Sequence, residues 1–184
     1  FPAGYVLVIA VSGVKHNLLQ SLYNTRREEC AAATEALGVE SLREVTPDHL
    51  EHAGGSVDPV LYQRAAHVVG ENDRVWRAIN ALEKTDVAEV GALMFASHES
   101  SRTNFQNSTA ELDLLVEIAR SLPGVLGSRL TGGGFGGGTV TLATTEESEN
   151  VVAGLKRKYA NETGHDPAVF VCRIADGAAV RWRE

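Results

Sequence analysis

The chain has 184 residues, 43% of them hydrophobic, which is enough for one sizeable folded core. Its formal net charge is -7, from 17 Lys and Arg residues against 24 Asp and Glu residues, and neither sign forms a long block. A chain of this kind repels nucleic acids and anionic membranes, and none of its apolar stretches approaches the ~20 residues of a membrane span, so we expect neither kind of partner.

The first predicted element is a strand over residues 5–11, YVLVIAV. Its continuous apolar run is typical of a strand that is covered on both faces. A long amphipathic helix follows, from Asn17, a residue type favoured at helix N-caps, to Gly38, a residue type favoured just past a helix end. The residues after Gly38 are predicted to form a polar connection.

Three more helices are predicted before the next strand. Their apolar residues recur at helical spacing, and suitable capping residues precede them, over residues 58–82, 86–97 and 109–121. We expect Gly70 to disturb the first of these helices, because glycine lowers helix stability. His67 and His98 lie on predicted helices, where we expect hydrogen-bonded histidines in the core or at its boundary.

The hydrophobic period changes after residue 121. Residues 125–130 and 139–144 alternate as strands do, residues 145–164 return to helical spacing, and AVFVCRI at 168–174 predicts a last strand. Grouped helices and strands joined by a hairpin indicate an α+β fold, an antiparallel sheet with helices covering one face. Because no repeat or linker is evident, we expect a single domain over residues 1–184.

The segment SRLTGGGFGGGTVTL, residues 128–142, joins two predicted strands, and six of the seven residues from Gly132 to Gly138 are glycine. Gly132, Gly134 and Gly137 satisfy the GxGxxG pattern, but a strand follows where dinucleotide-binding proteins have a helix. Two interpretations remain, a flexible hairpin tip or a bare backbone that packs against a ligand or a neighbouring phosphate-binding loop. The number of glycines exceeds what a hairpin tip needs, which favours the second.

Histidine and cysteine residues give weaker indications. His49 and His52 form an HxxH pair without a third ligand at suitable spacing, so we expect a solvated segment and no metal site. Cys30 and Cys172 lie far apart in apolar surroundings, without a CxxC pair. We interpret them as buried thiols and expect a cytoplasmic protein.

Tyr23 and Arg26 lie three residues apart in the first predicted helix and therefore share one face. The adjacent Arg27, Glu28 and Glu29 are interpreted as a solvated helix face with intrahelical ion pairs. An aromatic ring beside a guanidinium makes this face a candidate binding surface.

Five segments in chain order resemble the C-terminal half of the galactokinases, a branch of the GHMP sugar and metabolite kinases. They are YNTRREEC at 23–30, ENDRV at 71–75, LMFASHESSR at 93–102, ELDLLVEIA at 111–119 and the glycine-rich segment at 128–142. The resemblance runs from about residue 4 to residue 180. The glycine-rich segment marks the superfamily, and the tyrosine segment points to the galactokinases within it.

This resemblance implies ATP-dependent phosphorylation of the anomeric hydroxyl of α-D-galactose, with Mg2+, to give galactose 1-phosphate and ADP. It assigns the sugar-contacting tyrosine of the family to Tyr23. It also implies a glycine loop beside the point where sugar and γ-phosphate meet, formed here by Thr131, Gly132, Gly133, Gly134, Phe135, Gly136 and Gly137. The sequence does not indicate an oligomeric state.

The family's aspartate base, its positioning arginine and its serine-rich loop for ATP and Mg2+ belong to the N-terminal half, which this chain lacks. We therefore expect no catalytic residue here and no useful turnover from this segment alone. SRTNFQNST at 101–109 replaces an expected acidic stretch, and Leu22 replaces a small or acidic residue. Two alternatives stay open, a related sugar kinase acting on N-acetylgalactosamine and a galactose sensor without catalysis.

Overall fold

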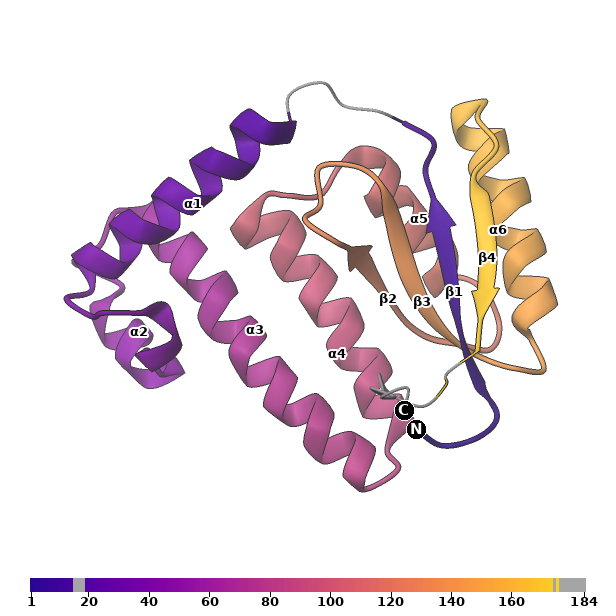
Figure 1. The fold of residues 1–184 in the computed structure, drawn as a ribbon, viewed down its shortest axis with the longest axis horizontal. Coiled ribbons are helices and arrows are strands. Elements are labelled where there is room, and N and C mark those ends of the chain that lie inside the picture. Colours follow the sequence, from indigo (N-terminus) through magenta and orange to yellow (C-terminus); the bar gives the residue numbers. More distant parts are fainter. Residues whose placement is uncertain (15–18, 174, 176–184) are drawn as a thin grey trace, which may run out of the picture.

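The computed structural model describes residues 1–14, 19–173 and 175 of the chain. One side of the molecule contains a four-stranded sheet in the order β2-β3-β1-β4, in which every neighbouring pair is antiparallel (Figure 1). The strands are β1 (Tyr5–Val11), β2 (Val125–Thr131), β3 (Gly138–Thr144) and β4 (Ala168–Cys172). This architecture confirms the predicted α+β class.

Six α-helices and two short helical turns make up the rest of the described fold. The α-helices are α1 (Leu19–Ala36), α2 (Pro47–Ala53), α3 (Pro59–Glu83), α4 (Val87–Ser100), α5 (Ala110–Arg120) and α6 (Ser148–Thr163). The turns are η1 (Leu42–Glu44), a 3-10 turn, and η2 (Ser101–Phe105), a π-helical turn. Capping side chains begin several helices, as at Asp58, whose carboxylate accepts from the amides of Val60 and Leu61 at 2.8 and 3.3 Å.

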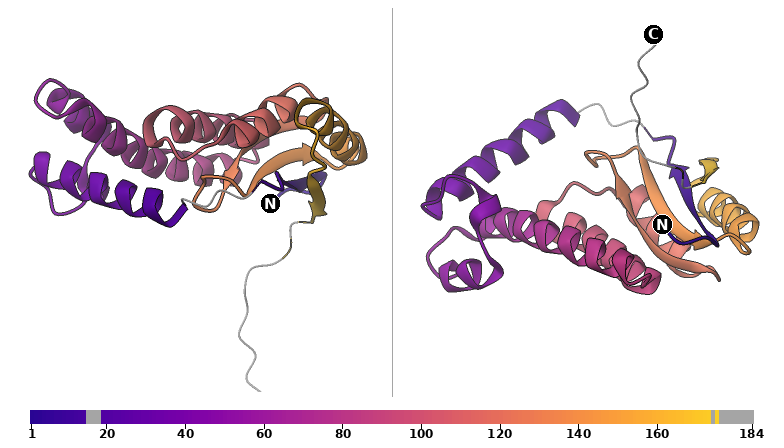
Figure 2. Two further views of the ribbon diagram at one scale, coloured as in Figure 1. Left: turned by 90° about the horizontal axis from the view of Figure 1, so that it is seen from above. Right: turned by 60° about the horizontal axis from the view of Figure 1, so that its bottom comes forward.

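One face of the sheet is covered by α5 and α6 (Figure 2). Val6, Val8 and Ala10 of β1 are buried on this face, while the alternate residues of β1 are only partly buried. The expectation that β1 is covered on both faces is therefore wrong for this structure, because α5 and α6 pack on one face only. Residues of both helices complete this core: Leu115, Ile118, Ala119, Val151, Leu155 and Tyr159.

A second apolar cluster joins α1, η1, α2 and α3, with Ala33, Leu50 and Val69 among its buried residues. These helices lie beyond the edge strand β2, and α4 lies between them and the strand (Figure 1). Glycines allow α4 to approach β2 closely, since a methyl group on Gly91 or Gly127 would fall within 3.0 Å of the facing backbone. Helix α4 is therefore the connection between the two cores.

Several details differ from the sequence-based expectations. The segment after Gly38 contains the helix α2 where a polar connection is predicted, and α3 is continuous through Gly70, because an interior glycine weakens a packed helix without breaking it. The thiol of Cys172 is exposed and that of Cys30 is only partly buried. The predicted helix start at Asn17 lies outside the described residues. Among the residues described, no helix has the length and apolar character needed to cross a bilayer.

Candidate active site

The glycine loop adopts a backbone that side chains rarely allow. Between β2 and β3, Gly132, Gly134, Gly136 and Gly137 all have positive φ angles, from 75° to 120°. Phe135 also has a positive φ, 56°, and its side chain is buried. Because residues with a Cβ are strained in this region, the run of glycines is required by the path of the chain.

The loop is held against the end of the helical layer. A Cβ on Gly134 would fall within 3.0 Å of Asn107, so only glycine fits there. The amide of Phe135 donates to the carbonyl oxygen of Asn107, and the Asn107 side-chain amide donates to the Gly133 carbonyl oxygen at 3.1 Å. On the other side, the Ser12 amide donates to the Gly137 carbonyl oxygen at 2.8 Å. The loop is thus a fixed element, contrary to the flexible-tip interpretation.

Tyr23 and the glycine loop line the same cavity, which has a volume of about 390 Å³. Gly132, Gly133 and Phe135 form the loop wall, and a methyl group on Gly133 would lie 4.0 Å from the Tyr23 ring. The Tyr23 side chain is 60% exposed, so a ligand in the cavity can reach it. The other predicted loop residues shape the loop without lining the cavity: Thr131, Gly134, Gly136 and Gly137.

The cavity wall is cationic. Arg26, Arg27 and Arg129 line it, and no carboxylate belongs to the described lining. Tyr23 and Arg26 both face the cavity, so the prediction that they share a helix face is confirmed. Guanidinium groups and the exposed backbone of glycines together suit a ligand that carries hydroxyl groups and an anionic group.

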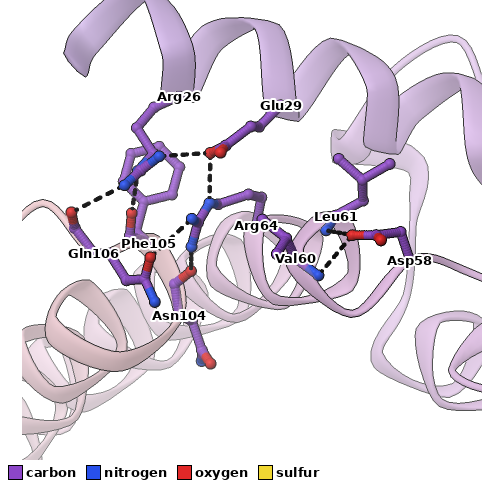
Figure 3. A network of polar contacts seen from close by, with 9 residues as sticks. All are labelled: Arg26, Glu29, Asp58, Val60, Leu61, Arg64, Asn104, Phe105 and Gln106. Atoms are coloured by element: carbon purple, nitrogen blue, oxygen red, sulfur yellow. Dashed lines mark hydrogen bonds and ion pairs between the residues drawn. The ribbon is translucent and has the colours of Figure 1, made fainter.

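Arg26 is fixed by partners on α1 and at η2 (Figure 3). It donates to the Glu29 carboxylate at 2.7 Å and to the Phe105 carbonyl oxygen at 2.6 Å. The same Glu29 oxygen accepts from Arg64 of α3 at 2.7 Å, so Glu29 pairs between helices as well as within α1. Burial raises the pKa of Glu29, but the hydrogen bonds from Arg64 and Arg26 outweigh it and bring the pKa below its usual value.

Arg129 is oriented by a second carboxylate. Its guanidinium lies 3.3 Å from Glu71 of α3, which also accepts from Arg74 at 2.6 Å and from the Ser97 hydroxyl at 2.8 Å. Burial raises the pKa of Glu71, but these hydrogen bonds and the two arginines bring it below the ordinary value. Glu71 therefore stays ionised and holds the Arg129 side chain beside the cavity.

Two histidines of the helical layer lie in or near the cavity wall. His67 lines it, stacks on Phe105 with ring centroids 4.4 Å apart, and shares a 3.0 Å hydrogen bond with the Ser100 hydroxyl. Burial lowers the pKa of His67 to about 4, so its imidazole is neutral near pH 7. His98 is buried and accepts from the Leu130 amide at 3.2 Å. The prediction of hydrogen-bonded histidines is confirmed.

Metal ligands are not grouped in the part of the chain that the structure describes. No three His, Cys, Asp or Glu side chains come together there as metal ligands would. His49 and His52 lie on the exposed side of α2.

Comparison with known proteins agrees with this geometry. Residues 78–161 match the family model described as GHMP kinases C terminal. The chain is 39% identical over 183 residues to the galactokinase of Glaesserella parasuis and 42% identical over 183 residues to that of Chloroflexus aggregans. A solved Lactococcus lactis galactokinase, complexed with galactose, matches 95% of this chain with a TM-score of 0.89 and 30% identity. Nearly the whole chain is therefore similar to one half of the galactokinases, and residues 78–161 match the C-terminal domain of the GHMP kinases.

The match covers nearly all of this chain and only part of each relative. The Glaesserella and Chloroflexus galactokinases align with 97% of this chain, over 48% and 47% of their own lengths, and the Lactococcus structure aligns over 46% of its length. The chain therefore spans about half the length of the galactokinases that it matches.

Several residues of the site are not singled out by the sequence pattern. Arg129 precedes the glycine loop in a predicted strand, and its position on the strand gives no indication that it reaches Glu71. Arg64 lies in the middle of a helix and is 2% exposed, although arginine is rarely buried. Asn107 lies in the 101–109 segment, whose departure from the family pattern is the one sequence feature that marks this region.

Proposed function

We propose that this chain is the C-terminal half of a galactokinase, and that the complete polypeptide phosphorylates the anomeric hydroxyl of α-D-galactose. ATP is the phosphoryl donor, and the products are galactose 1-phosphate and ADP. The observation that supports this most directly is that Tyr23 and the glycine loop line one cavity, in a fold shared with a galactokinase complexed with galactose. The unit that carries this half of the site is a single domain over residues 1–184.

Tyr23 is the proposed sugar contact. Its phenol offers a hydroxyl that can donate to or accept from a sugar hydroxyl, and its exposed ring can pack against the apolar side of the sugar. The ring stands opposite Gly133, where the absence of a side chain leaves room for a ligand. This arrangement supports binding of a sugar between α1 and the loop.

The glycine loop, Thr131 to Gly137, is the proposed wall beside the transferred phosphoryl group. Bare backbone permits close approach, and amide groups fixed in advance stabilise developing negative charge better than mobile groups do. Arg26, Arg27 and Arg129 add positive charge on the same side of the cavity. The wall therefore suits a reaction in which a neutral sugar becomes an anion.

ATP and Mg2+ are proposed cofactors of the complete enzyme. Mg2+ neutralises charge on the phosphate oxygens during phosphoryl transfer. We assign its ligands, the main ATP loop and the base that activates the sugar hydroxyl to the N-terminal half. This chain alone should then bind sugar weakly and show no turnover. We also propose that the enzyme works in the cytoplasm.

Kinetics on the complete polypeptide, on this chain alone and on a Tyr23→Phe variant of the complete polypeptide test the proposal. Loss of one hydrogen bond to a sugar hydroxyl should raise KM for galactose about tenfold in the variant, with a smaller change in KM for ATP. Tyr62→Phe, a tyrosine substitution on α3 outside the lining of the cavity, is the matched control. Robust turnover by the isolated chain would contradict the assignment of roles to the two halves.

Substrate competition separates the alternatives. A higher kcat/KM for N-acetylgalactosamine than for galactose would indicate the related sugar kinase. Binding of galactose and ATP by the complete polypeptide without product formation would indicate a sensor. Either result would contradict the proposed galactokinase activity.

A further inference from the structure

The π-helical turn at the end of α4 contacts both walls of the cavity. We call residues Ser101–Asn107, which comprise η2 and the two residues after it, the π-turn joint. Within the joint, Gln106 directly follows η2 and is in the left-handed conformation, with a φ of 53° and a ψ of 45°. Carbonyl groups at the end of a helix lack partners inside the helix, so the joint needs hydrogen-bond donors from other elements.

Two arginines from other helices supply those donors (Figure 3). Arg64 of α3 donates to the Asn104 carbonyl oxygen and, at 2.9 Å, to the Gln106 side-chain oxygen. Arg26 of α1 donates to the Phe105 carbonyl oxygen at 2.6 Å. Positive charge at a helix C-terminus is favourable, and both guanidiniums share the Glu29 carboxylate, so α1, α3 and the joint form one ionic cluster.

The last residue of the joint, Asn107, holds the glycine loop. The Asn107 side chain is 6% exposed and donates to the Gly133 carbonyl oxygen at 3.1 Å. The Asn107 backbone oxygen accepts a hydrogen bond from the Phe135 amide. A Cβ on Gly134 would overlap Asn107, so the two segments pack directly against each other. Asn107 therefore fixes the position of the loop. Arg26, Arg64 and Glu29 fix the position of α1 in the same way.

We propose that Asn107 and Arg64 are positioning residues of the active site, which fix the glycine loop and the Tyr23 helix to neighbouring residues of the π-turn joint. This inference rests on the proposed function for its catalytic meaning. Asn107 acts on the wall beside the transferred phosphoryl group. Arg64 acts on α1, which carries Tyr23, the proposed sugar contact.

The chemistry of the two side chains makes the proposal specific. Asparagine is required at 107 because its amide nitrogen donates to a carbonyl oxygen, and an aspartate carboxylate of the same shape could only accept. Arginine is required at 64 because its planar fork reaches Glu29, Asn104 and Gln106 at once, which a lysine ammonium cannot do.

Hydrogen exchange on the 184-residue chain tests the structural part of the proposal. Asn107→Ala should speed exchange at the Phe135 amide about tenfold, because the loop loses its side-chain anchor, and Asn107→Asp should do the same. The matched control is Asn150→Ala on α6, which removes an amide hydrogen bond to Glu147 of 2.8 Å far along the chain. Unchanged exchange at Phe135 in both Asn107 variants would overturn the proposal.

Kinetics on the complete enzyme test the catalytic part. Asn107→Ala should lower kcat about tenfold with little change in KM for galactose, whereas Arg64→Lys should mainly raise KM for galactose by about tenfold. Arg77→Lys, on the exposed side of α3, is the matched control for the second variant. A tenfold rise in KM for galactose in Asn107→Ala, or a lower kcat with unchanged KM in Arg64→Lys, would contradict the division of roles.

Failure of this inference can be distinguished from failure of the proposed function. If the complete wild-type polypeptide does not phosphorylate galactose, the proposed function is wrong. The exchange rates at Phe135 then still decide whether Asn107 fixes the loop. A double variant adds a further check, because Asn107→Ala and Arg64→Lys act through one joint and their effects on kcat/KM should be less than additive.

Discussion

The pKa of His67 depends on how tightly the cavity wall is packed around its imidazole. It stacks on Phe105, accepts or donates one hydrogen bond at Ser100, and has a pKa of about 4 because its surroundings exclude water. The ordinary value is 6.5. An imidazole in the unfolded chain therefore takes up a proton at a higher pH than the folded one does.

This difference predicts a pH dependence of stability. Between pH 6.5 and pH 4 the unfolded state binds more protons at position 67, so the free energy of unfolding falls as the pH falls through this range. The contribution of His67 to that loss is about 2 to 3 kcal/mol. His67→Phe keeps an aromatic ring against Phe105 and removes the titration. Urea unfolding at pH 7 and pH 4 should show a smaller loss in the variant, and parallel losses would contradict the assignment.

Neighbouring glycines of the loop have different reasons to be glycine. Gly134 has a φ of 78° and no room for a Cβ beside Asn107, whereas Gly133 has ordinary space next to Tyr23. Gly134→Ala should lower the free energy of unfolding by about 2 to 4 kcal/mol through backbone strain and steric overlap. Gly133→Ala is the matched control and should change it by less than about 1 kcal/mol. Equal effects in urea unfolding would show that the loop does not pack on Asn107.

Elements differ in how far the sequence determines them. Caps and apolar periodicity predict α3, α4 and α5, and alternation predicts the hairpin of β2 and β3. Helix α2 is missed because it is seven residues long and buries only Leu50, so it has almost no periodic pattern, although Thr46 and Pro47 are suitable starting residues. Local propensity is a weak guide for an element this short.

The π-turn joint cannot be predicted from local sequence. The arginines that donate to its carbonyl groups lie 79 and 40 residues away in the chain. Contacts between residues far apart in the sequence also limit the prediction of the site. A motif predicts Tyr23 and the glycine loop as site residues, whereas Arg64, Asn107 and Arg129 make contacts with distant elements that no motif indicates.

The packing of α4 on β2 predicts a strong difference between two helix glycines. A Cβ on Gly91 would overlap the backbone of Leu126, which cannot move without displacing β2. Gly91→Ala should therefore cost about 3 kcal/mol or more, since overpacking forces a backbone shift. Gly70→Ala in α3 would meet only the end of the Arg74 side chain and should be neutral or stabilise by up to about 1 kcal/mol. Thermal unfolding distinguishes them, and a tolerated Gly91→Ala would show that α4 can separate from β2.

At the scale of the whole molecule, the two hydrophobic cores differ in how far apart in the sequence their elements lie. The sheet core contains Leu155 and Tyr159, both fully buried, and joins strands from both ends of the chain. The helical core is built from α1, η1, α2 and α3, which are close in sequence. Within the described residues, α4, the π-turn joint and the ion pair between Arg129 and Glu71 connect it to the sheet and the loop. Local opening of the helical core should therefore cost less free energy than global unfolding.

Two leucine-to-alanine variants test this inequality by hydrogen exchange. Leu50→Ala leaves a cavity in the helical core and should speed exchange in α1 and α2 while protection in β1 and β3 stays unchanged. Leu155→Ala leaves a cavity in the sheet core and should lower global stability by about 2 to 5 kcal/mol, with faster exchange throughout. If Leu50→Ala speeds exchange in β1 as much as in α2, the molecule opens as one unit. In that case Tyr23 and the glycine loop cannot separate without unfolding of the sheet itself.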